Sequence, residues 1–588
     1  MSRTPIILSL AVLVFASAVL RAKPSASHIA KPAATPAVKG VQVLSKDGNS
    51  IIWQGKEYKP IDDTGVYYYD VESVSGVPMP MPRTALRDAL SRNGFHGVVR
   101  CELVDYVDCT KTDHGFVDDG KSRVLRLADG NLYRVTGAGG RLSWFSYFLR
   151  TRPVPGRPHL VVVQTINDIE RYTTVSMTVP KGASWAPPYT GEEKKYVSTM
   201  QDDWYHPDVG GCVYTGREYP LDGKHMNYMF LYYPKARQVK VTVSHFTLEE
   251  AYQEINGAAV ARIWLFDILD PMDKLDADPI APKQGKERRL AIYEPHGWFM
   301  YAHYGIPAVT KEQRQANLRV YADYLKFCGI NQVQFHVING SDVARCAWYD
   351  SKLYDNLQGN LIEEFSPIAA EKGIELVPIV APIMTPYGGN LDKIPDKPDK
   401  DGFCKLSLQL DRDGKYANTM GCYAPDPLRP EVQEWMAKCL REVLDRVAKY
   451  PNIPGVAFRV NGKIGLCYVG YETDRCGQDK GYSEWDISEF EKDTGIKVPR
   501  MHPTPYSWIR ANAWEQWEDW RCKRMHDFWL RMRDLVRSYR PDLKLIVACD
   551  LPSEYPGYNI EWVDGIPPRE LMRHHGYDPE LFKNDEGR

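Results

Sequence analysis

Carboxylates and aromatic side chains gather in one stretch of the sequence, directly after the apolar strand pattern GVAFRV at 455–460. The polar and aromatic residues of this stretch are Asn461, Lys463, Tyr468, Tyr471, Glu472, Asp474, Tyr482 and Trp485. With few cations among them, they suit a neutral ligand that forms hydrogen bonds, such as a sugar. In a parallel α/β barrel, a loop at the carboxyl end of a strand lines the site. The stretch predicts a carbohydrate site without by itself establishing an enzyme.

The chemistry that such carboxylates support is cleavage of a glycosidic bond by one protonated acid and one ionised carboxylate. Glu472 is the first candidate for the acid, because desolvation by Tyr471 and nearby aromatic rings would favour its protonated form. The alternative is a solvent-exposed loop glutamate. Asp550 ends the strand pattern LKLIVAC and is the best partner by position, with Asp474 as a further carboxylate. The alternative for Asp550 is a turn or cap aspartate before Leu551.

Other strand ends supply candidate substrate-binding groups. Glu294 ends a predicted strand and begins EPHGWFMYAHYG, which also holds His296 and Trp298. A purely structural role is the alternative for these residues. Asp426 lies in PDPLRPEV, where it either contacts substrate or caps the helix that is predicted from Pro430. Candidate rings for stacking on sugars are Trp298, Tyr301, Trp348, Tyr468, Tyr471 and Trp485.

Composition excludes several other classes of function. The net charge of −2 provides no field that would favour nucleic acid or an anionic membrane. The sequence contains no G-x-S-x-G, no H-E-x-x-H and no C-x-x-C, so serine hydrolase, zincin and structural zinc sites lack support. No metal and no cofactor is predicted, and the predicted partner is a carbohydrate ligand.

The amino terminus resembles a secretory signal. An apolar run from Ile6 to Leu20 follows Arg3 and contains the A-x-A pattern Ala16-Ser17-Ala18. We therefore expect a signal peptide over 1–22 and a secreted or periplasmic protein, with attachment to the cell surface as a further option. An uncleaved membrane anchor is the alternative. No later stretch reaches the roughly 18 apolar residues of a membrane helix, so no integral membrane domain is predicted.

Twelve cysteines in an exported chain permit disulfides. The pairs closest in sequence are Cys101/Cys109, Cys404/Cys422 and Cys467/Cys476. Spacing does not determine the connectivity. Cys328, Cys439 and Cys549 lie within apolar helix or strand patterns, which is typical of free core thiols.

Two kinds of hydrophobic pattern divide the chain. Residues 23–40 are rich in Ala, Pro, Ser and Lys and predict a flexible linker. From 41 to 285, short alternating segments such as HLVVVQT and VKVTVSHF predict a β-sandwich-like region. From 286 to 588, strands alternate with helices, which predicts βαβ units and a parallel sheet. Five strands are predicted there, so the fold class is all-β followed by a (β/α) TIM-type barrel that is cut short at its carboxyl end.

Several phrases of the second region resemble family 10-like glycosyl hydrolases and beta-galactosidase-like barrels of polysaccharide-degrading bacteria. These phrases are FCGINQVQFHVINGSD, FSPIAAEKGIELVPIV, DPLRPEVQEWM, FEKDTGIKVP and RPDLKLIV, within about 288–560. The resemblance implies a barrel and a glycoside hydrolase activity. It departs from the related retaining enzymes at one point: where they carry Asn-Glu after strand four, this chain has Asn461-Gly462. The rival interpretation is therefore a carbohydrate-binding or surface protein with a degenerate, non-catalytic barrel.

Overall fold

The structure is a computed structural model that describes most of the chain from Cys101 onward. The described ranges are 101–138, 142–180, 205–216, 220–234, 237–246, 256–269, 289–294, 304–306, 310–340, 345–356, 359–381, 391–419, 422–460, 480–501, 504–549 and 568–583, with residues 300, 308 and 386–387 and the short strands β1 Val43–Leu44, β2 Ile51–Trp53 and β3 Lys56–Tyr58. These parts belong to two compact units. One consists of 1–188, 194–290 and 298–330, and the other of 189–193, 291–297 and 331–588.

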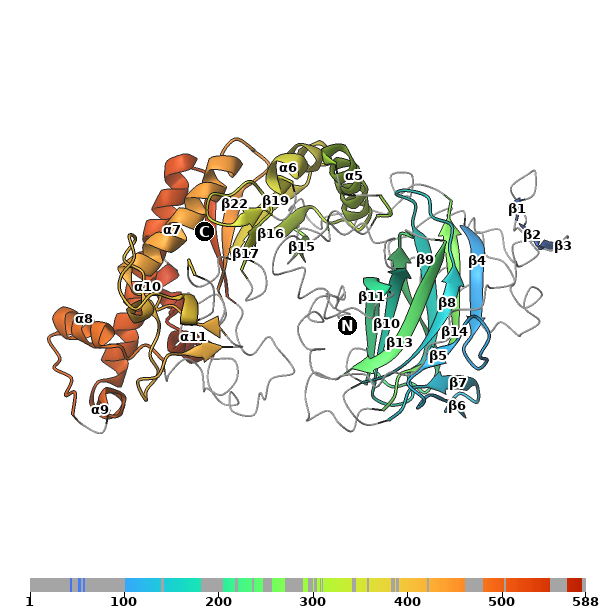
Figure 1. The fold of residues 1–588 in the computed structure, drawn as a ribbon, viewed down its shortest axis with the longest axis horizontal. Helices are drawn as coiled ribbons and strands as arrows, with labels where there is room; N and C mark the ends of the chain where they lie inside the picture. Colours follow the sequence, from blue (N-terminus) through green and yellow to red (C-terminus); the bar gives the residue numbers. More distant parts are fainter. Residues whose placement is uncertain are drawn as a thin grey trace, which may run out of the picture. The chain divides into compact units, whose positions relative to one another are not determined.

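The first unit contains two antiparallel sheets (Figure 1). One has the strand order β11 Tyr205–Thr215, β10 Arg171–Pro180, β13 Gln238–Phe246, β8 Leu142–Arg150 and β5 Val117–Asp118. The other has the order β12 His225–Tyr232, β9 His159–Ile166, β14 Ala259–Ile268, β7 Leu132–Val135 and β6 Arg123–Arg126, and β4 Cys101–Asp108 also pairs with β14.

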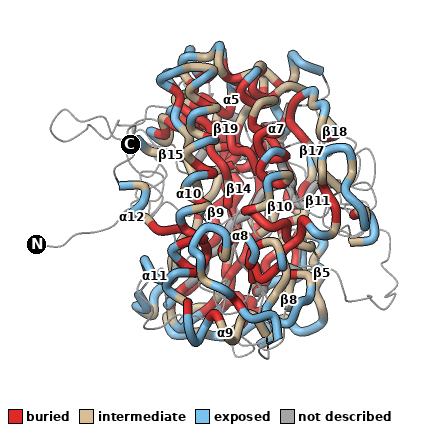
Figure 2. Tube along the Cα trace, turned by 90° about the vertical axis from the view of Figure 1, so that its left-hand side faces the viewer, coloured by how far each residue is buried: buried red, intermediate tan, exposed pale blue. Residues whose placement is uncertain are grey.

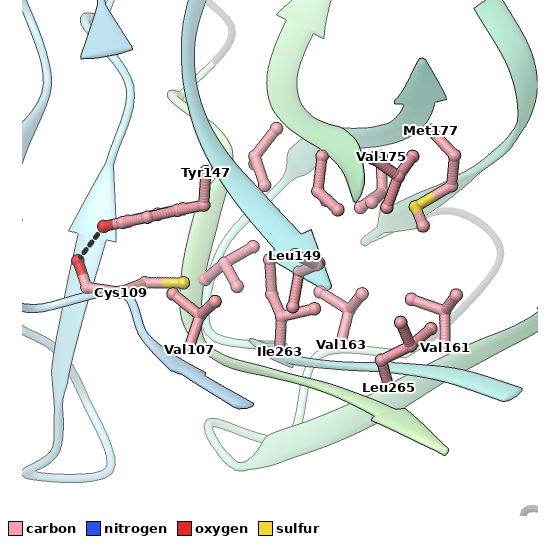
Figure 3. Close-up of a cluster of buried hydrophobic side chains, with 14 of the residues drawn as sticks. Val107, Cys109, Tyr147, Leu149, Val161, Val163, Val175, Met177, Ile263 and Leu265 are labelled. Carbon is pink, nitrogen blue, oxygen red and sulfur yellow. Dashed lines mark hydrogen bonds between the residues drawn. The ribbon is translucent and has the colours of Figure 1, made fainter. Parts of the chain in front are cut away.

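Alternating side chains of the two sheets share one core. Tyr147 and Leu149 of β8 point into it from one sheet, and Val163 of β9 and Leu265 of β14 enter it from the other (Figure 3). All four are completely buried. The Tyr147 hydroxyl donates a hydrogen bond to the Cys109 carbonyl oxygen at 2.8 Å. Burial of one face of each sheet explains the apolar–polar alternation of the sequence here.

The cysteines whose side chains the structure describes do not form the disulfides that the sequence permits. Cys101, Cys109 and Cys404 carry reduced thiols. Cys101 begins β4 and Cys109 follows its last residue, so this extended strand separates them by about 26 Å, well beyond the roughly 7 Å limit for the Cα atoms of a disulfide. Cys328 and Cys439 are also reduced thiols, as predicted. Cys467, Cys476 and the Cys549 side chain lie outside the described residues.

The second unit is built on a parallel sheet whose strands follow one another in chain order. They are β15 Ala291–Glu294, β16 Gln332–Gly340, β19 Glu375–Ala381, β22 Gly455–Val460 and β23 Lys544–Cys549. At one margin, β17 Arg345–Ala347 pairs antiparallel with β16 and β18 Asp355–Asn356 pairs with β17. A short hairpin of β20 Asn418–Thr419 and β21 Cys422–Tyr423 precedes the helix that begins at Pro430.

Helices pack on one face of this parallel sheet (Figure 1). Helices α6 Leu361–Glu371 and α7 Pro430–Val447 contact β19, and α10 Trp514–Tyr539 contacts β23. Phe335 of β16 packs against Phe365 of α6, with ring centroids 6.4 Å apart. Phe458 of β22 packs against Trp529 of α10 at 5.4 Å. The face that carries Phe335 and Phe458 is therefore the helix-covered face.

One of the remaining helices has clear signals at both ends. The α8 helix, Glu484–Thr494, begins with a capping box between Ser483 and Asp486 and ends at Gly495 with φ 77°. The other helices are α5 Lys311–Phe327 in the first unit and α9 Pro505–Asn512, α11 Pro568–His574 and α12 Pro579–Phe582 in the second.

Buried residues run along the strands and along the inward faces of the helices, while exposed residues mark the helix ends and turns (Figure 2). The described chain is thus mixed α/β, with antiparallel sheets in one unit and a parallel sheet in the other. The described residues contain no further parallel strand that would close a barrel. None of the helices that the structure describes combines the length and apolar character needed to cross a membrane.

Candidate functional site

A polar cluster lies on the face of the parallel sheet opposite the helices. Tyr293 of β15 and His336 of β16 point to this face, because each alternates with a neighbour on the helix-covered face. The Tyr293 hydroxyl and His336 Nε2 are 2.7 Å apart, and their rings meet edge to face with centroids separated by 5.4 Å. His336 is buried and Tyr293 is partly buried. The pair therefore presents one hydroxyl and one imidazole beside the sheet.

Arg459 of β22 joins this cluster from across the sheet. Its guanidinium carbon lies 5.7 Å from the centroid of the Tyr293 ring. The strands of the two residues are separated by β16 and β19, or about 14 Å along a flat sheet. The two side chains thus converge over this face, as expected on the concave side of a curved sheet. A cation over an aromatic ring holds that ring in place.

Small and branched apolar side chains form the floor between these polar groups. Val377, Ile379 and Ala381 of β19 and Ala457 of β22 make one buried cluster, and Tyr293 packs against it. Ile546 of β23 also packs against the cluster. Polar groups above an apolar floor provide both hydrogen bonds and a surface for the carbon faces of a ligand.

The carboxyl ends of the strands meet at one edge of the sheet. Val460, the last residue of β22, is the register partner of Cys549, the last residue of β23. Asn461 and Asp550 follow these two residues in sequence and lie outside the described residues, as do Tyr468, Tyr471, Glu472, Asp474, His296 and Trp298. For those residues, the structure establishes which strand ends precede them in the chain.

Glu294 is described and lies in a different environment from the polar cluster. It is the last residue of β15, only 9% exposed, and its register partner is Phe335. Strand alternation assigns Glu294 to the face of Phe335 and Tyr293 to the opposite face. Tyr293 therefore belongs to the polar cluster, whereas Glu294 lies on the other face of the same strand.

Asp426 is completely buried. Its Oδ1 accepts a hydrogen bond from the Leu428 amide at 3.0 Å, and its own amide donates to the Ser407 carbonyl at 2.8 Å. The first-turn cap of α7 is Arg429, not Asp426. Asp426 thus closes the turn before the helix. With no exposed surface, its side chain is not in a position to contact a ligand in this structure.

Two aromatic candidates also belong to the interior. Trp348 is 1% exposed. Tyr482 stacks on Trp517 of α10, with ring centroids 5.5 Å apart and an interplanar angle of 7°. Trp485 is partly buried, and the Arg429 guanidinium lies 5.1 Å from its ring. Of these three rings, the structure leaves only Trp485 with substantial exposed surface.

Sequence reasoning missed His336, Arg459 and Tyr293 as site residues, although a signal for them was present. In QVQFHVI, polar Gln332, Gln334 and His336 alternate with apolar residues, which marks a strand with one polar face. Arg459 likewise interrupts an otherwise apolar strand. A polar residue in a core strand of a parallel sheet indicates a functional face, because both faces are otherwise apolar.

A nucleotide-binding motif is matched in sequence but not in structure. Residues 115–122, GFVDDGKS, fit the pattern G-x-x-x-x-G-K-S. A phosphate-binding loop of this type leads into a helix, whose first amides hold the phosphate. Here the segment contains β5 and is followed by β6, and the Gly120 amide donates to Asp118 Oδ1 at 3.0 Å. The match therefore does not form a phosphate site.

Among the described side chains, no group of three or more His, Cys, Asp or Glu residues is arranged to hold a metal ion. Neither a family model nor a curated protein matches the sequence.

Solved structures of sugar-cleaving enzymes show a partial likeness to the chain. One is alpha-L-fucosidase isoenzyme 2 from Paenibacillus thiaminolyticus, at 12% identity and a TM-score of 0.27, over 44% of this chain and 32% of that one. Another is the alpha-galactosidase from Lactobacillus brevis, at 9% identity and a TM-score of 0.25, over 77% and 58%. A third is the beta-galactosidase from Marinomonas ef1, at 13% and 0.26, over 41% and 36%. The chain spans less than two thirds of each, and likenesses at these TM-scores carry no argument about fold or activity.

Proposed function

We propose that this protein acts on a polysaccharide or oligosaccharide as a glycoside hydrolase-like protein, with its site at the carboxyl-terminal edge of the parallel sheet. The register pairing of Val460 with Cys549 is the observation that carries the proposal. Neighbouring strands lie about 4.8 Å apart, so the chain leaves both strands within reach of one sugar unit. Asn461 and the loop with Glu472 follow one of these ends, and Asp550 follows the other.

In this proposal, cleavage proceeds by acid/base catalysis with two carboxyl groups. Glu472, protonated, donates its proton to the glycosidic oxygen as the bond to the leaving sugar breaks. Asp550, ionised, either attacks the anomeric carbon or takes a proton from the attacking water. These two routes require carboxyl groups about 5 to 5.5 Å or about 6.5 to 9.5 Å apart, respectively. Asp474 is the alternative second carboxylate in the same loop.

Substrate binding in this proposal combines the polar cluster with the loops. Tyr293 and Arg459 offer polar groups above the apolar floor of the sheet, and buried His336 holds the Tyr293 hydroxyl in place. The proposed loop contributions are hydrogen bonds from Asn461 and His296 and aromatic surfaces from Trp298, Tyr468 and Tyr471. Glu294 is not part of this binding set, because strand alternation assigns it to the helix-covered face. Asp426 is left out because its side chain is completely buried.

The arrangement of the sheet supports a TIM-type barrel as the scaffold of the second unit. Its five parallel strands lie side by side in chain order, and helices α6, α7 and α10 pack on one face. A sheet wound in one direction keeps its crossover helices on a single face, as in barrels. An open doubly wound sheet would carry helices on both faces.

The rival proposal is a carbohydrate-binding protein without catalysis. The specific observation in its favour is Asn461-Gly462, where related retaining enzymes carry Asn-Glu. Both proposals predict binding of a sugar polymer, but only the first predicts turnover.

The test is an assay of turnover and binding on a panel of polysaccharides and oligosaccharides. The variants are Glu472→Gln and Asp550→Asn, with Glu515→Gln as a control at an exposed position of α10. We expect turnover by the wild type and a loss of turnover of at least about 100-fold in either site variant. Glu515→Gln should keep the wild-type turnover. Binding measured by affinity electrophoresis should survive in the site variants.

Full turnover in Glu472→Gln would refute its role as the acid. Binding by the wild type without turnover on any substrate would favour the non-catalytic rival. Neither binding nor turnover on the whole panel would refute both proposals.

We also propose that the protein is exported, to the periplasm or beyond the cell, on the basis of the signal-like sequence over 1–22. Mass spectrometry of the mature protein checks this: cleavage near Ala18 is expected, and an intact Met1 in the purified protein contradicts it.

A further inference from the structure

Two buried aspartates from distant parts of the chain meet in the second unit. Asp426 lies in the turn before α7, and Asp486 lies in the first turn of α8. Neither side chain has any exposed surface. Their carboxyl groups lie close enough to interact, and each affects the pKa of the other. Two like groups in such a position require a chemical explanation, because two carboxylates in an apolar interior repel each other.

The hydrogen bonds of the pair to other groups use one oxygen of each carboxyl group. They leave the other, here called the facing oxygen, for the partner aspartate. Asp426 Oδ1 accepts from the Leu428 amide at 3.0 Å. Asp486 Oδ2 accepts from the Ser483 hydroxyl at 2.6 Å and from the Ser483 amide at 3.1 Å. Within the described part of the chain, Asp426 Oδ2 and Asp486 Oδ1 receive no N–H or O–H donor.

An ionised carboxylate has only acceptors, so two of them cannot satisfy each other. A single proton placed between the facing oxygens satisfies both, since the protonated group becomes a donor. This arrangement is the same in principle as that of acid pairs that cannot both ionise.

The charged groups around the pair do not replace this proton. Arg429, at the start of α7, and Arg521, on α10, act on the pair through their charges. These arginines contact Glu431, Lys480 and His574, and His574 contacts Glu518. Arg521 donates to the carbonyl oxygens of Lys480 and His574, at 3.4 and 3.2 Å. Arg429 bonds Glu431 at 2.9 Å, and His574 bonds Glu518 at 2.5 Å. The charges of Arg429 and Arg521 act on the pair without donating to its two facing oxygens.

The pair also connects separate segments of the unit. The Asp426 amide donates to the Ser407 carbonyl, and the Gly481 amide donates to the Leu410 carbonyl at 2.9 Å. Asp411 and Lys480 form an isolated antiparallel bridge beside them. The contact between Asp426 and Asp486 thus joins the segment around 407–411 and the turn before α7 to the start of α8.

We propose that Asp426 and Asp486 share one proton and that the protonated pair is a pH-sensitive lock between the turn before α7 and the amino-terminal end of α8. Loss of the proton at alkaline pH leaves two buried negative charges in contact. The first turn of α8 then separates from the turn before α7. This inference concerns described residues alone and does not depend on the proposed activity.

Proton linkage determines the sign of the effect. Burial is the largest cause that raises the pKa of Asp426 well above 3.8 and also raises the pKa of Asp486. In the unfolded chain both groups ionise near their ordinary values, so folding takes up a proton above about pH 4. The folding equilibrium constant then falls by up to about tenfold for each unit of rising pH, until the folded pair itself ionises.

The decisive variant is Asp426→Asn. Its amide oxygen can still accept from Leu428, and its NH2 group replaces the shared proton at the facing oxygen. We expect this variant not to take up the proton on folding. Its folding equilibrium constant should therefore change less with pH than that of the wild type, by up to about tenfold per pH unit. The control is Asp411→Asn, which removes one negative charge from the segment around 407–411. It should leave the pH dependence of the folding equilibrium constant unchanged.

Two measurements give a local signal. Hydrogen exchange of the α8 amides, expressed as protection factors, should fall with rising pH in the wild type but not in Asp426→Asn. At pH 8, where Asp267 with its pKa of about 6 is ionised, the infrared carbonyl band of a protonated carboxyl group should be weaker in the variant than in the wild type. A wild-type slope, protection profile and infrared band in Asp426→Asn would overturn the proposal.

If Asp426→Asn fails to fold, Asp486→Asn is the second test, because its amide can donate from the other side of the same contact. Flattened pH dependence in this variant supports the shared proton. Failure of both variants to fold would also overturn the proposal, since an amide would then be unable to take the place of a proton on either side.

Discussion

His159 of β9 and Asp267 of β14 are register partners inside the first unit, and neither side chain has any exposed surface. His159 Nδ1 and Asp267 Oδ1 are 3.7 Å apart, while Arg157 Nη2 lies 2.6 Å from Asp267 Oδ2. Burial lowers the pKa of His159 to about 3 and raises the pKa of Asp267 to about 6. On folding, the histidine therefore loses a proton over the same pH range in which the aspartate gains one.

In the wild type, the effects of these two proton changes on the pH dependence of the free energy of unfolding nearly cancel between about pH 4 and 6. In Asp267→Asn, only the histidine changes its protonation on folding, so the free energy of unfolding should rise with pH from about 3 to 6.5. His159→Gln leaves the aspartate effect, so the free energy of unfolding should fall as pH rises from about 4 to 6. Each slope should differ from that of the wild type by up to about 1.4 kcal/mol per pH unit, with opposite signs. Denaturant unfolding at pH 4, 5 and 6 measures them, and equal slopes in both variants would contradict the cancellation.

The contact between Tyr293 and His336 yields a second prediction. Tyr293→Phe removes a hydrogen bond of 2.7 Å to a buried imidazole and keeps the ring under Arg459. The free energy of unfolding should fall by about 1 kcal/mol, as for loss of a typical hydrogen bond. If this face binds sugar, affinity for the best polysaccharide of the panel should also fall. Tyr416→Phe, at a partly buried tyrosine of the same unit, is the control for affinity. Unchanged affinity in Tyr293→Phe would remove this face from the binding site.

A third prediction concerns the contact between α11 and the start of α12. Asp578 accepts hydrogen bonds from Arg569 Nη2 at 2.8 Å and Arg573 Nη1 at 2.6 Å. The Arg569 side chain is the largest cause that lowers the pKa of Asp578, to about 2 from 3.8. This contribution to stability is complete above about pH 4 and disappears as pH falls toward 2. Asp578→Asn should lower the free energy of unfolding at pH 7 by about 2 kcal/mol.

The matched control is Asp519→Asn, which removes the exposed partner of the same Arg573 and should cost less than about 1 kcal/mol. Chemical denaturation at pH 7 and pH 3 distinguishes the two sites. The difference between the variants should shrink at the lower pH, and a difference that does not depend on pH would contradict the role of the ionised carboxylate.

Much of the secondary structure could be predicted from sequence period and end signals. The strand GVAFRV coincides with β22, and the pattern from Trp514 to Tyr539 coincides with α10. Trp517, Trp520 and Trp529, which recur at helical spacing, are buried as core residues. By contrast, the sequence pattern does not indicate β8. Its aromatic residues lie on both faces: Phe145 is in the core, whereas Trp144 is only partly buried, which obscures the period of two.

The partners of polar residues could not be predicted, because they are contacts between distant segments. Asp486 looks like an ordinary capping-box residue in sequence, and Asp426 like a helix cap. Their contact depends on how the turn before α7 and the start of α8 are brought together, which no local pattern encodes. The same reason hides the approach of Arg459 to Tyr293 across two intervening strands. The carboxylates Glu472, Asp474 and Asp550 remain predictions from sequence. The described ends of β22 and β23 show only which strands precede them in the chain.

The close pairing of β22 with β23 provides a test of the sheet that presents the proposed site. An ideal Cβ built on Gly455 would lie 2.5 Å from the Lys544 carbonyl oxygen, closer than Cβ atoms approach backbone atoms. Gly455→Ala should therefore push the two strands apart and lower the free energy of unfolding by about 1–3 kcal/mol.

Gly495→Ala is the comparison. This glycine has open space around it but a φ of 77°, so the substitution should lower the free energy of unfolding by about 1 kcal/mol through backbone strain alone. Because β22 and β23 end at Val460 and Cys549, we expect Gly455→Ala also to weaken sugar binding, whereas Gly495→Ala should not. Thermal unfolding and affinity electrophoresis on the two variants measure both effects. Wild-type stability in Gly455→Ala would contradict the strand spacing on which the proposed site depends.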